Sequence, residues 1–129
     1  MYRRVALTKA LPMDILNIIF ALASIGLGCF GWLAPRYTLG ALDLTGGQTT
    51  MGMSEVRASV GCLFVGMGVG ALLLGTPTAY VMLGACWCGA AIGRLTSVIF
   101  DGNSGKKFTY FVVEAAVGIP AIALNLGSI

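Results

Sequence analysis

The chain contains two apolar runs separated by one polar turn: AYVMLGACWCGAAIGRLTSVIF (residues 79–100), DGNSGKK (residues 101–107) and FTYFVVEAAVGIPAIALNL (residues 108–126). A helix of about 20 apolar residues crosses the roughly 30 Å hydrocarbon core of a bilayer, and each run has about that length. Because the turn between them is short, the two helices should be antiparallel neighbours. This stretch therefore predicts a helical hairpin that lies within a membrane.

Two more apolar runs lie earlier in the chain, at about residues 15–33 and 56–75, and each is bounded by proline, glycine or charged residues. Residues 35–54, between these two runs, are expected to form a longer loop. The sequence predicts an all-α fold, an integral membrane four-helix bundle, built as a single transmembrane domain over residues 1–129. The four spans are expected at about residues 15–33, 56–75, 79–100 and 108–126.

The composition of the chain supports a membrane location. Its 129 residues are 57% hydrophobic and 10% charged, whereas about a quarter of the residues of an average soluble domain are charged. A soluble domain of this size would need a mostly polar surface, which so few charged residues cannot supply. The composition excludes an ordinary soluble enzyme, a nucleic-acid-binding protein and a disordered segment. We expect the lipid bilayer and other membrane protein subunits as partners, and no nucleic acid.

The chain contains no histidine and four cysteines: Cys29, Cys62, Cys86 and Cys88. Without histidine it lacks the commonest metal ligand and the usual general base. All four cysteines lie in apolar runs, where a thiol usually packs as a small hydrophobic group. Cys86 and Cys88 would point about 200° apart on a helix, so we expect both to be reduced and dispensable, with a redox or metal role as the alternative. We therefore predict no catalytic, cofactor-binding or metal-ligating residue and no cofactor.

Small or polar residues recur at helical spacing in every span, and helices in lipid pack through such faces. The predicted interior faces are Asn17, Ala21, Ser24, Gly28 and Gly31 in the first span, Cys86, Ala90, Gly93 and Ser97 in the third, and Glu114, Gly118, Ala121 and Asn125 in the fourth. In the second span Gly66 and Gly70 are a small-residue pair, and Arg57, Gly61 and Gly68 follow one side. We interpret these glycines as sites of tight helix packing, because their spacing does not fit a phosphate-binding motif.

Five ionisable residues lie in or beside the last three spans: Glu55, Arg57, Arg94, Asp101 and Glu114. Such residues are costly within a membrane and normally face the interior or pair with one another. Alternating spans should bring all five to one end of the bundle as an intramembrane charged cluster. The interpretation that we favour is a set of ion pairs that fixes helix register. The alternative is a polar site for a small polar or anionic solute or for a proton.

Arg94 and Glu114 are the pair that we expect within this cluster. Both residues lie about 9 Å from the polar turn, at about 1.5 Å per helical residue. Equal distance from the turn places two residues of antiparallel helices at the same depth. Asp101, two turns from Arg94 on the same face, and Glu55, at the start of the second helix, are the rival partners of Arg94.

Several short motifs resemble those of a bacterial family of small four-helix membrane proteins with no assigned function: Ser54-Glu55-Val56-Arg57-Ala58, Gly93-Arg94, Asp101-Gly102 and Glu114. The resemblance covers about residues 15–128. It implies a four-helix fold and a role that Glu55, Arg57, Arg94 and Glu114 share with relatives, but it implies no reaction. The family pattern has an aromatic residue and a second glycine after Glu-x-Arg, where this chain has Ser59-Val60-Gly61-Cys62. This departure weakens the case for a shared ligand site.

Three basic residues, Arg3, Arg4 and Lys9, precede the first span. The apolar run that follows is longer than that of a signal peptide, so we interpret this segment as an uncleaved first anchor. Three basic residues fall on each side of the membrane, so the positive-inside rule does not decide the orientation. Because the first helix usually dominates, we expect both termini on the same, cytoplasmic, side of a bacterial inner membrane.

The function that these observations favour is that of a non-enzymatic accessory or assembly subunit of a larger membrane complex. If the protein is such a subunit, we expect it to co-purify with that complex in mild detergent. The alternative is a small-solute or ion carrier that uses the charged cluster, in which case neutralising Arg94 should abolish binding or flux. A membrane enzyme or quinone-linked redox protein has the least support, because the chain contains no histidine and no cofactor motif.

Overall fold

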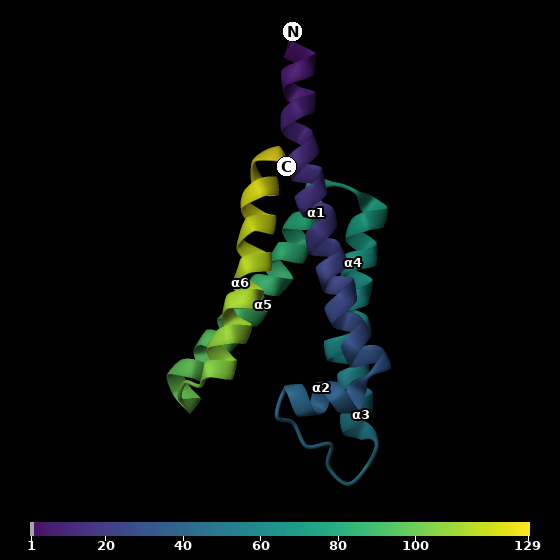
Figure 1. The fold of residues 1–129 in the computed structure, drawn as a ribbon, viewed down its shortest axis with the longest axis vertical. Helices are drawn as coiled ribbons and strands as arrows, with labels where there is room; N and C mark the ends of the chain where they lie inside the picture. Colours follow the sequence, from purple (N-terminus) through teal and green to yellow (C-terminus); the bar gives the residue numbers. More distant parts are fainter. Residues whose placement is uncertain (1) are drawn as a thin grey trace. The chain divides into compact units, whose positions relative to one another are not determined.

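The computed structural model describes the backbone of residues 2–129 and the side chains of residues 14–129. Within residues 2–129 every regular element is a helix, and no strand occurs (Figure 1). The elements are α1 (Tyr2–Leu33), α2 (Pro35–Ala41), α3 (Met51–Glu55), the π-helical η1 (Val56–Cys62), α4 (Leu63–Leu74), α5 (Pro77–Asp101), α6 (Gly105–Asn125) and the 3-10 helix η2 (Leu126–Ser128). The side chains of Arg3, Arg4 and Lys9, on which the expected orientation rests, lie outside the described residues.

Among the described residues, four helices are long and apolar enough to cross a membrane: Asp14–Leu33, Met51–Leu74, Pro77–Asp101 and Gly105–Ser128. This finding confirms the predicted all-α class with four membrane-spanning helices, and it identifies the chain as an integral membrane protein. The single domain over residues 1–129 stays a prediction.

The second span begins earlier than the sequence predicts. Its helix starts at Met51, because α3, η1 and α4 follow one another without a break and the residues at their junctions, Val56 and Leu63, have helical backbone angles. Pro35, at the first position of α2, also starts a short helix inside the expected loop, since its fixed φ suits a helix start. The irregular segment between the first two spans is therefore shorter than the predicted loop of residues 35–54.

The polar turn between the last two spans is also shorter than predicted. Gly102 ends α5 at a φ of +85°, a backbone angle that glycine adopts without steric cost. The side chain of Ser104 accepts a hydrogen bond from the backbone N–H of Lys107, so α6 begins directly after Ser104. Lys106 and Lys107 therefore lie in the first turn of α6 rather than in a loop.

The chain divides into two compact units, which are described separately. The hairpin unit consists of residues 1–17 and 74–129, and it contains α5, α6 and the first part of α1. The α1–α4 unit consists of residues 18–73, and it contains the rest of α1 together with α2, α3, η1 and most of α4.

In the hairpin unit α5 and α6 run side by side from their short connection (Figure 1). Their backbones touch at Gly84 and Gly118: a Cβ atom at Gly84 would lie 2.8 Å from the carbonyl oxygen of Gly118, and one at Gly118 would lie 2.7 Å from the backbone nitrogen of Cys88. The buried face of α6 consists of Glu114, Gly118, Ala121 and Asn125, which is the predicted face. Close approach at small residues is therefore the basis of this helix pair.

The predicted packing face of α5 is wrong. Cys86 and Gly93 are exposed, and a Cβ atom at Gly89 or Gly93 would meet nothing within 4 Å. The buried residues of α5 are instead Tyr80, Leu83, Gly84, Trp87 and Ala91. Both sides of α5 carry small residues, but the side with Gly84 also carries large apolar residues, which bury more surface.

Two asparagines connect the first and last spans within the hairpin unit. The Nδ2 of Asn17 donates to the Oδ1 of Asn125 at 2.8 Å, and the Nδ2 of Asn125 donates to the Oδ1 of Asn17 at 2.7 Å. Asn125 also donates to the carbonyl oxygen of Ala121 at 2.8 Å. Both side chains are buried, so each amide satisfies the other in a region without water.

In the α1–α4 unit, α1 contacts the second span through glycine. A Cβ atom at Gly28 would lie 2.7 Å from the carbonyl oxygen of Gly61, and a Cβ atom at Gly61 would lie 2.6 Å from the backbone nitrogen of Trp32. Gly61 belongs to the π-helical segment η1, a rare form that usually occurs as a local bulge in an α-helix. The predicted faces that contain Gly28, Gly31, Gly61 and Gly68 are therefore correct.

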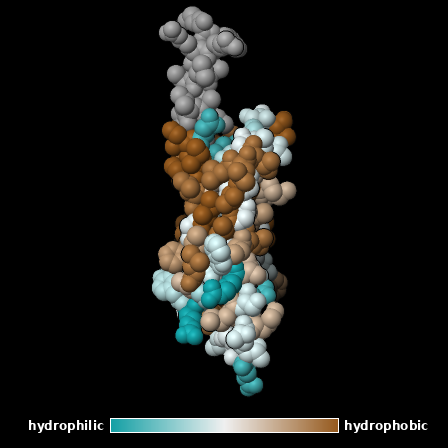
Figure 2. All heavy atoms as spheres, turned by 90° about the vertical axis from the view of Figure 1, so that its right-hand side faces the viewer, coloured by the Kyte–Doolittle hydropathy of each residue, from teal (hydrophilic) through white to brown (hydrophobic). Residues whose placement is uncertain are grey.

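The predicted small-residue pair of the second span, Gly66 and Gly70, does not pack against any other described residue. A Cβ atom at either position would meet nothing within 4 Å. Figure 2 looks onto the side of the molecule that carries α4 and shows apolar side chains over much of this face. Leu63 and Leu73 of α4 are exposed, as expected of a helix that contacts lipid.

We predict that Gly61→Ala lowers the free energy of unfolding by about 1–3 kcal/mol, because the new Cβ atom would overlap the backbone of α1. The matched control is Gly66→Ala, which lies one and a half turns further along the same helix in open space. It should be neutral or stabilising by up to about 1 kcal/mol, since alanine favours a helix. Thermal unfolding in mild detergent measures both changes, and equal losses would contradict the close contact.

Candidate functional site

Arg94 of α5 and Glu114 of α6 form an ion pair, as the sequence predicts. The Nη2 of Arg94 donates to the Oε1 of Glu114 at 2.7 Å, and the Nε donates to the Oε2 at 3.4 Å. Both carboxylate oxygens are therefore occupied by one edge of the guanidinium group. The side chain of Arg94 is 30% exposed and that of Glu114 is 10% exposed, so the arginine forms the outer part of the pair.

The direction of helical side chains explains how the two residues meet. At about 1.5 Å per residue, Arg94 lies about 10 Å from the end of α5 and Glu114 about 13 Å from the start of α6. Side chains lean toward the N-terminus of their own helix. Glu114 therefore leans toward the connection between the helices and Arg94 leans away from it, which compensates for the difference in depth.

Tyr110 adds a second contact to Arg94, which the sequence analysis did not predict. The Cζ atom of Arg94 lies 5.4 Å from the centroid of the Tyr110 ring. An arginine at this distance from an aromatic ring is attracted to the ring face. The available signal was spacing: Tyr110 precedes Glu114 by four residues and therefore lies on the same face of α6.

Asp101, the rival partner nearest to the membrane surface, does not pair with Arg94. Its Oδ2 accepts a hydrogen bond from the Oγ of Ser97 at 2.9 Å, one turn earlier on α5. Asp101 is exposed at the end of the helix. This contact is local to α5 and does not join two helices.

Arg57 and Glu55 belong to the α1–α4 unit. The Nη1 of Arg57 donates to the carbonyl oxygen of Trp32, in the last turn of α1, where carbonyl groups lack helical partners. Glu55 accepts a hydrogen bond from the Oγ of Ser59 within its own helix. Arg94, Asp101 and Glu114 belong to the other unit, so the convergence of all five charged residues at one end of a bundle stays a prediction.

The described part of the chain offers few groups for chemistry. Among the described side chains, no buried nitrogen or oxygen atom lacks a hydrogen-bond partner. In the same residues, no group of three or more His, Cys, Asp or Glu side chains lies close enough to hold a metal ion. The four cysteines are free thiols. Cys86 is exposed, whereas Cys88 lies close to Gly118.

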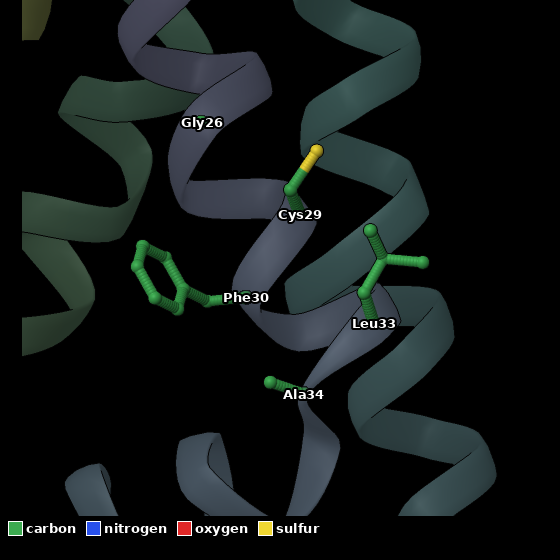
Figure 3. A pocket seen from close by; sticks show the side chains of 5 residues that line it. All are labelled: Gly26, Cys29, Phe30, Leu33 and Ala34. Atoms are coloured by element: carbon green, nitrogen blue, oxygen red, sulfur yellow. The ribbon is translucent and has the colours of Figure 1, made fainter.

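One hollow lies beside the C-terminal end of α1 (Figure 3). Its lining consists of Gly26, Cys29, Phe30, Leu33 and Ala34. Figure 3 shows the side chains of Cys29 and Phe30 pointing to different sides of α1. The lining carries no charged group and no hydroxyl or amide side chain, so it cannot orient a polar solute.

The model of a family described as a domain of unknown function, DUF4345, matches residues 12–125. No curated protein matches the chain. No solved structure matches it either.

We predict that Arg94 and Glu114 are energetically coupled. Arg94→Met and Glu114→Gln should each destabilise the protein, because each leaves one charged group without its partner. The double variant should lose less than the two single losses together, by about 0.5–3 kcal/mol. Thermal unfolding in detergent measures the cycle.

The matched control for this cycle combines Arg94→Met with Asp101→Asn. These two losses should simply add, because Asp101 bonds to Ser97 and not to Arg94. Coupling that appears only in the control cycle would show that Arg94 uses Asp101 instead of Glu114.

Proposed function

The chain belongs to the DUF4345 family, which has no assigned function, and we propose that it is a non-enzymatic accessory or assembly subunit of a larger membrane complex. In this proposal its spans pack beside the helices of another membrane protein. No reaction is assigned to it.

The observation that carries the proposal is the open face of α5. Gly89 and Gly93 are four residues apart, and added Cβ atoms at these positions would meet nothing within 4 Å. Cys86, one turn before Gly89, is exposed on the same side. Small residues at this spacing let two membrane helices approach closely. A glycine in a helix costs about 1 kcal/mol relative to alanine, so glycines that pack against none of the described residues are best accounted for by an external helix.

The polar groups give less support to the alternative of a small-solute or ion carrier. Both oxygens of Glu114 are engaged by Arg94, and the hollow beside α1 is apolar. A solute would have to break the ion pair before it could bind there. A structural role explains Arg94 and Glu114 without a solute, because their ion pair fixes the register of α5 against α6.

We place the protein in a bacterial inner membrane with both termini on the cytoplasmic side, as part of this proposal. Four spans return the chain to the side on which it began, which supports termini on one side. The basic residues before the first span support the cytoplasmic side.

We expect the tagged protein, extracted from its own membrane in mild detergent, to elute with another membrane protein in a fixed ratio that native mass spectrometry can measure. Gly93→Leu should reduce the retained partner about tenfold, because a bulky side chain would separate the two helices by enough to cost about 1.4 kcal/mol.

Gly26→Leu is the matched control for that experiment. Gly26 also lies in a span, and a Cβ atom there would meet nothing within 4 Å. This variant should retain the partner. A protein that elutes alone under all conditions, or a partner that Gly93→Leu does not weaken, would contradict the proposal.

The topology can be tested by cysteine labelling in a cysteine-free background. Cysteines placed at Thr49, between the first two spans, and at Ser104, between the last two, should react with an impermeant maleimide from the same side of the membrane. A cysteine placed in the segment of residues 75–76 should react from the other side. Labelling of positions 49 and 104 from opposite sides would contradict four alternating spans.

A further inference from the structure

Arg57, in the second span, carries guanidinium donors that no described residue accepts. Its Nη1 donates to the carbonyl oxygen of Trp32, and no other acceptor among the described residues reaches it. A guanidinium group has five N–H donors, so the Nε, both hydrogens of Nη2 and one hydrogen of Nη1 remain. In Arg94 the Nε and Nη2 bind the two oxygens of Glu114. The equivalent edge of Arg57 is open.

The guanidinium group of Arg57 lies at the end of the first span, where the membrane surface falls. That span ends at Leu33, and the contact with the carbonyl group of Trp32 places the guanidinium group level with its last residues. The second span begins at Met51, and helical side chains lean toward the N-terminus of their helix, so Arg57 leans outward. Trp32 and Tyr37 are exposed here, as in an interfacial belt. Lipid headgroups lie at this depth.

The charge of Arg57 is not neutralised within the α1–α4 unit. Its partner, the Trp32 carbonyl group, is neutral, whereas Arg94 meets a carboxylate. Neither acidic side chain described in this unit, Asp43 or Glu55, pairs with Arg57. Glu55 points to the other side of the helix, because residues two positions apart are about 200° apart around the axis. An uncompensated arginine at headgroup depth attracts an anionic lipid.

A second basic residue lies at the same end of this unit. Arg36 is exposed in the first turn of α2, and it has no hydrogen bond or ion pair with another described residue. Because α2 packs against η1 and the adjoining α3, Arg36 and Arg57 belong to one junction of α1, α2 and η1 (Figure 1). Two arginines without an acidic partner make this junction basic.

The backbone that carries Arg57 is also unusual. Arg57 is the second residue of the π-helical segment η1, and π-helical turns inside α-helices occur frequently at functional sites. The same segment is fixed against α1 by the close contact of Gly61 with Trp32. Arg57 therefore extends from a packed backbone, and a preorganised group loses less conformational freedom when it binds a ligand.

From these observations we propose that Arg57, together with Arg36, binds the phosphate group of an anionic membrane phospholipid at the junction of α1, α2 and η1. The ligand chemistry is a phosphate oxyanion. The Nε and Nη2 of Arg57 are parallel donors that would bind two of its oxygens, while the Nη1 keeps its contact with Trp32. This site does not depend on the proposed protein partner, so it can be tested on the purified chain.

Native mass spectrometry of the detergent-purified chain can measure lipid binding, with dioleoyl phosphatidylglycerol as the probe. Dioleoyl phosphatidylcholine and inorganic phosphate are the comparison ligands. We expect phosphatidylglycerol to bind more tightly than phosphatidylcholine, because only phosphatidylglycerol carries a net negative charge. Equal binding of the two lipids would overturn the proposal. Binding of inorganic phosphate without binding of phosphatidylglycerol would overturn the assignment to a lipid.

Arg57→Lys separates phosphate binding from a structural role. Lysine keeps the positive charge and can still donate to the carbonyl group of Trp32, but it cannot present two parallel donors, so phosphatidylglycerol should bind about tenfold more weakly. The matched control is Arg94→Lys, the same substitution at a guanidinium edge that Glu114 already occupies, and it should leave lipid binding unchanged. If Arg57 only held the end of α1, Arg57→Lys would bind the lipid as tightly as the natural protein. That result, or equal weakening by both variants, would overturn the proposal.

Arg36→Gln keeps the proposal testable if Arg57→Lys fails to fold. Arg36 is exposed on α2, so its loss should leave the fold intact and weaken phosphatidylglycerol binding about threefold. Glu55→Gln is the control at the same end of the unit. It should not weaken binding, because it removes a negative charge that points away from Arg57. Unchanged binding in Arg36→Gln, or equal weakening by both variants, would overturn the site.

Discussion

Polar side chains inside the spans must find partners within the protein, because hydrocarbon offers them none. In the hairpin unit Arg94 pairs with Glu114, and Asn17 pairs with Asn125. Each pair joins two different helices and therefore fixes which faces meet and at which depth. Apolar contacts alone cannot do this in a membrane, since lipid tails are as apolar as leucine. The polar pairs set the register, and the glycine contacts then bring the helices together.

The packing face of a helix can be predicted from the sequence where only one face of that helix carries small or polar residues. The interior faces of α1 and α6 combine small residues with asparagine or glutamate at helical spacing, so they could be identified without a structure. α5 has two faces with small residues, one with Gly84 and one with Gly93. In the structure the face with Gly84 packs against Gly118 of α6. Which of the two faces packs depends on how the whole helix is rotated about its axis, and the local sequence does not determine that rotation.

The candidate site could be predicted in part for a similar reason. Similar distances from one turn indicate that Arg94 and Glu114 meet on antiparallel helices, and the opposite lean of the two side chains compensates for the difference of about 3 Å in depth. Spacing places Tyr110 on the same face of α6 as Glu114, but its contact with Arg94 was not predicted, because aromatic residues near helix ends usually belong to the interfacial belt of a membrane protein. Spacing along a helix also does not determine which nitrogens of Arg94 donate to Glu114.

The arrangement of residues on α5 connects the proposed partner helix with the Arg94–Glu114 pair. Successive residues on a helix are about 100° apart, so Arg94 adjoins Gly93 around the axis. A partner helix that packs on Gly89 and Gly93 would therefore border the Arg94–Glu114 pair and exclude water and lipid from one side of it. The ion pair would then lie in a medium of lower dielectric constant, where its attraction is stronger.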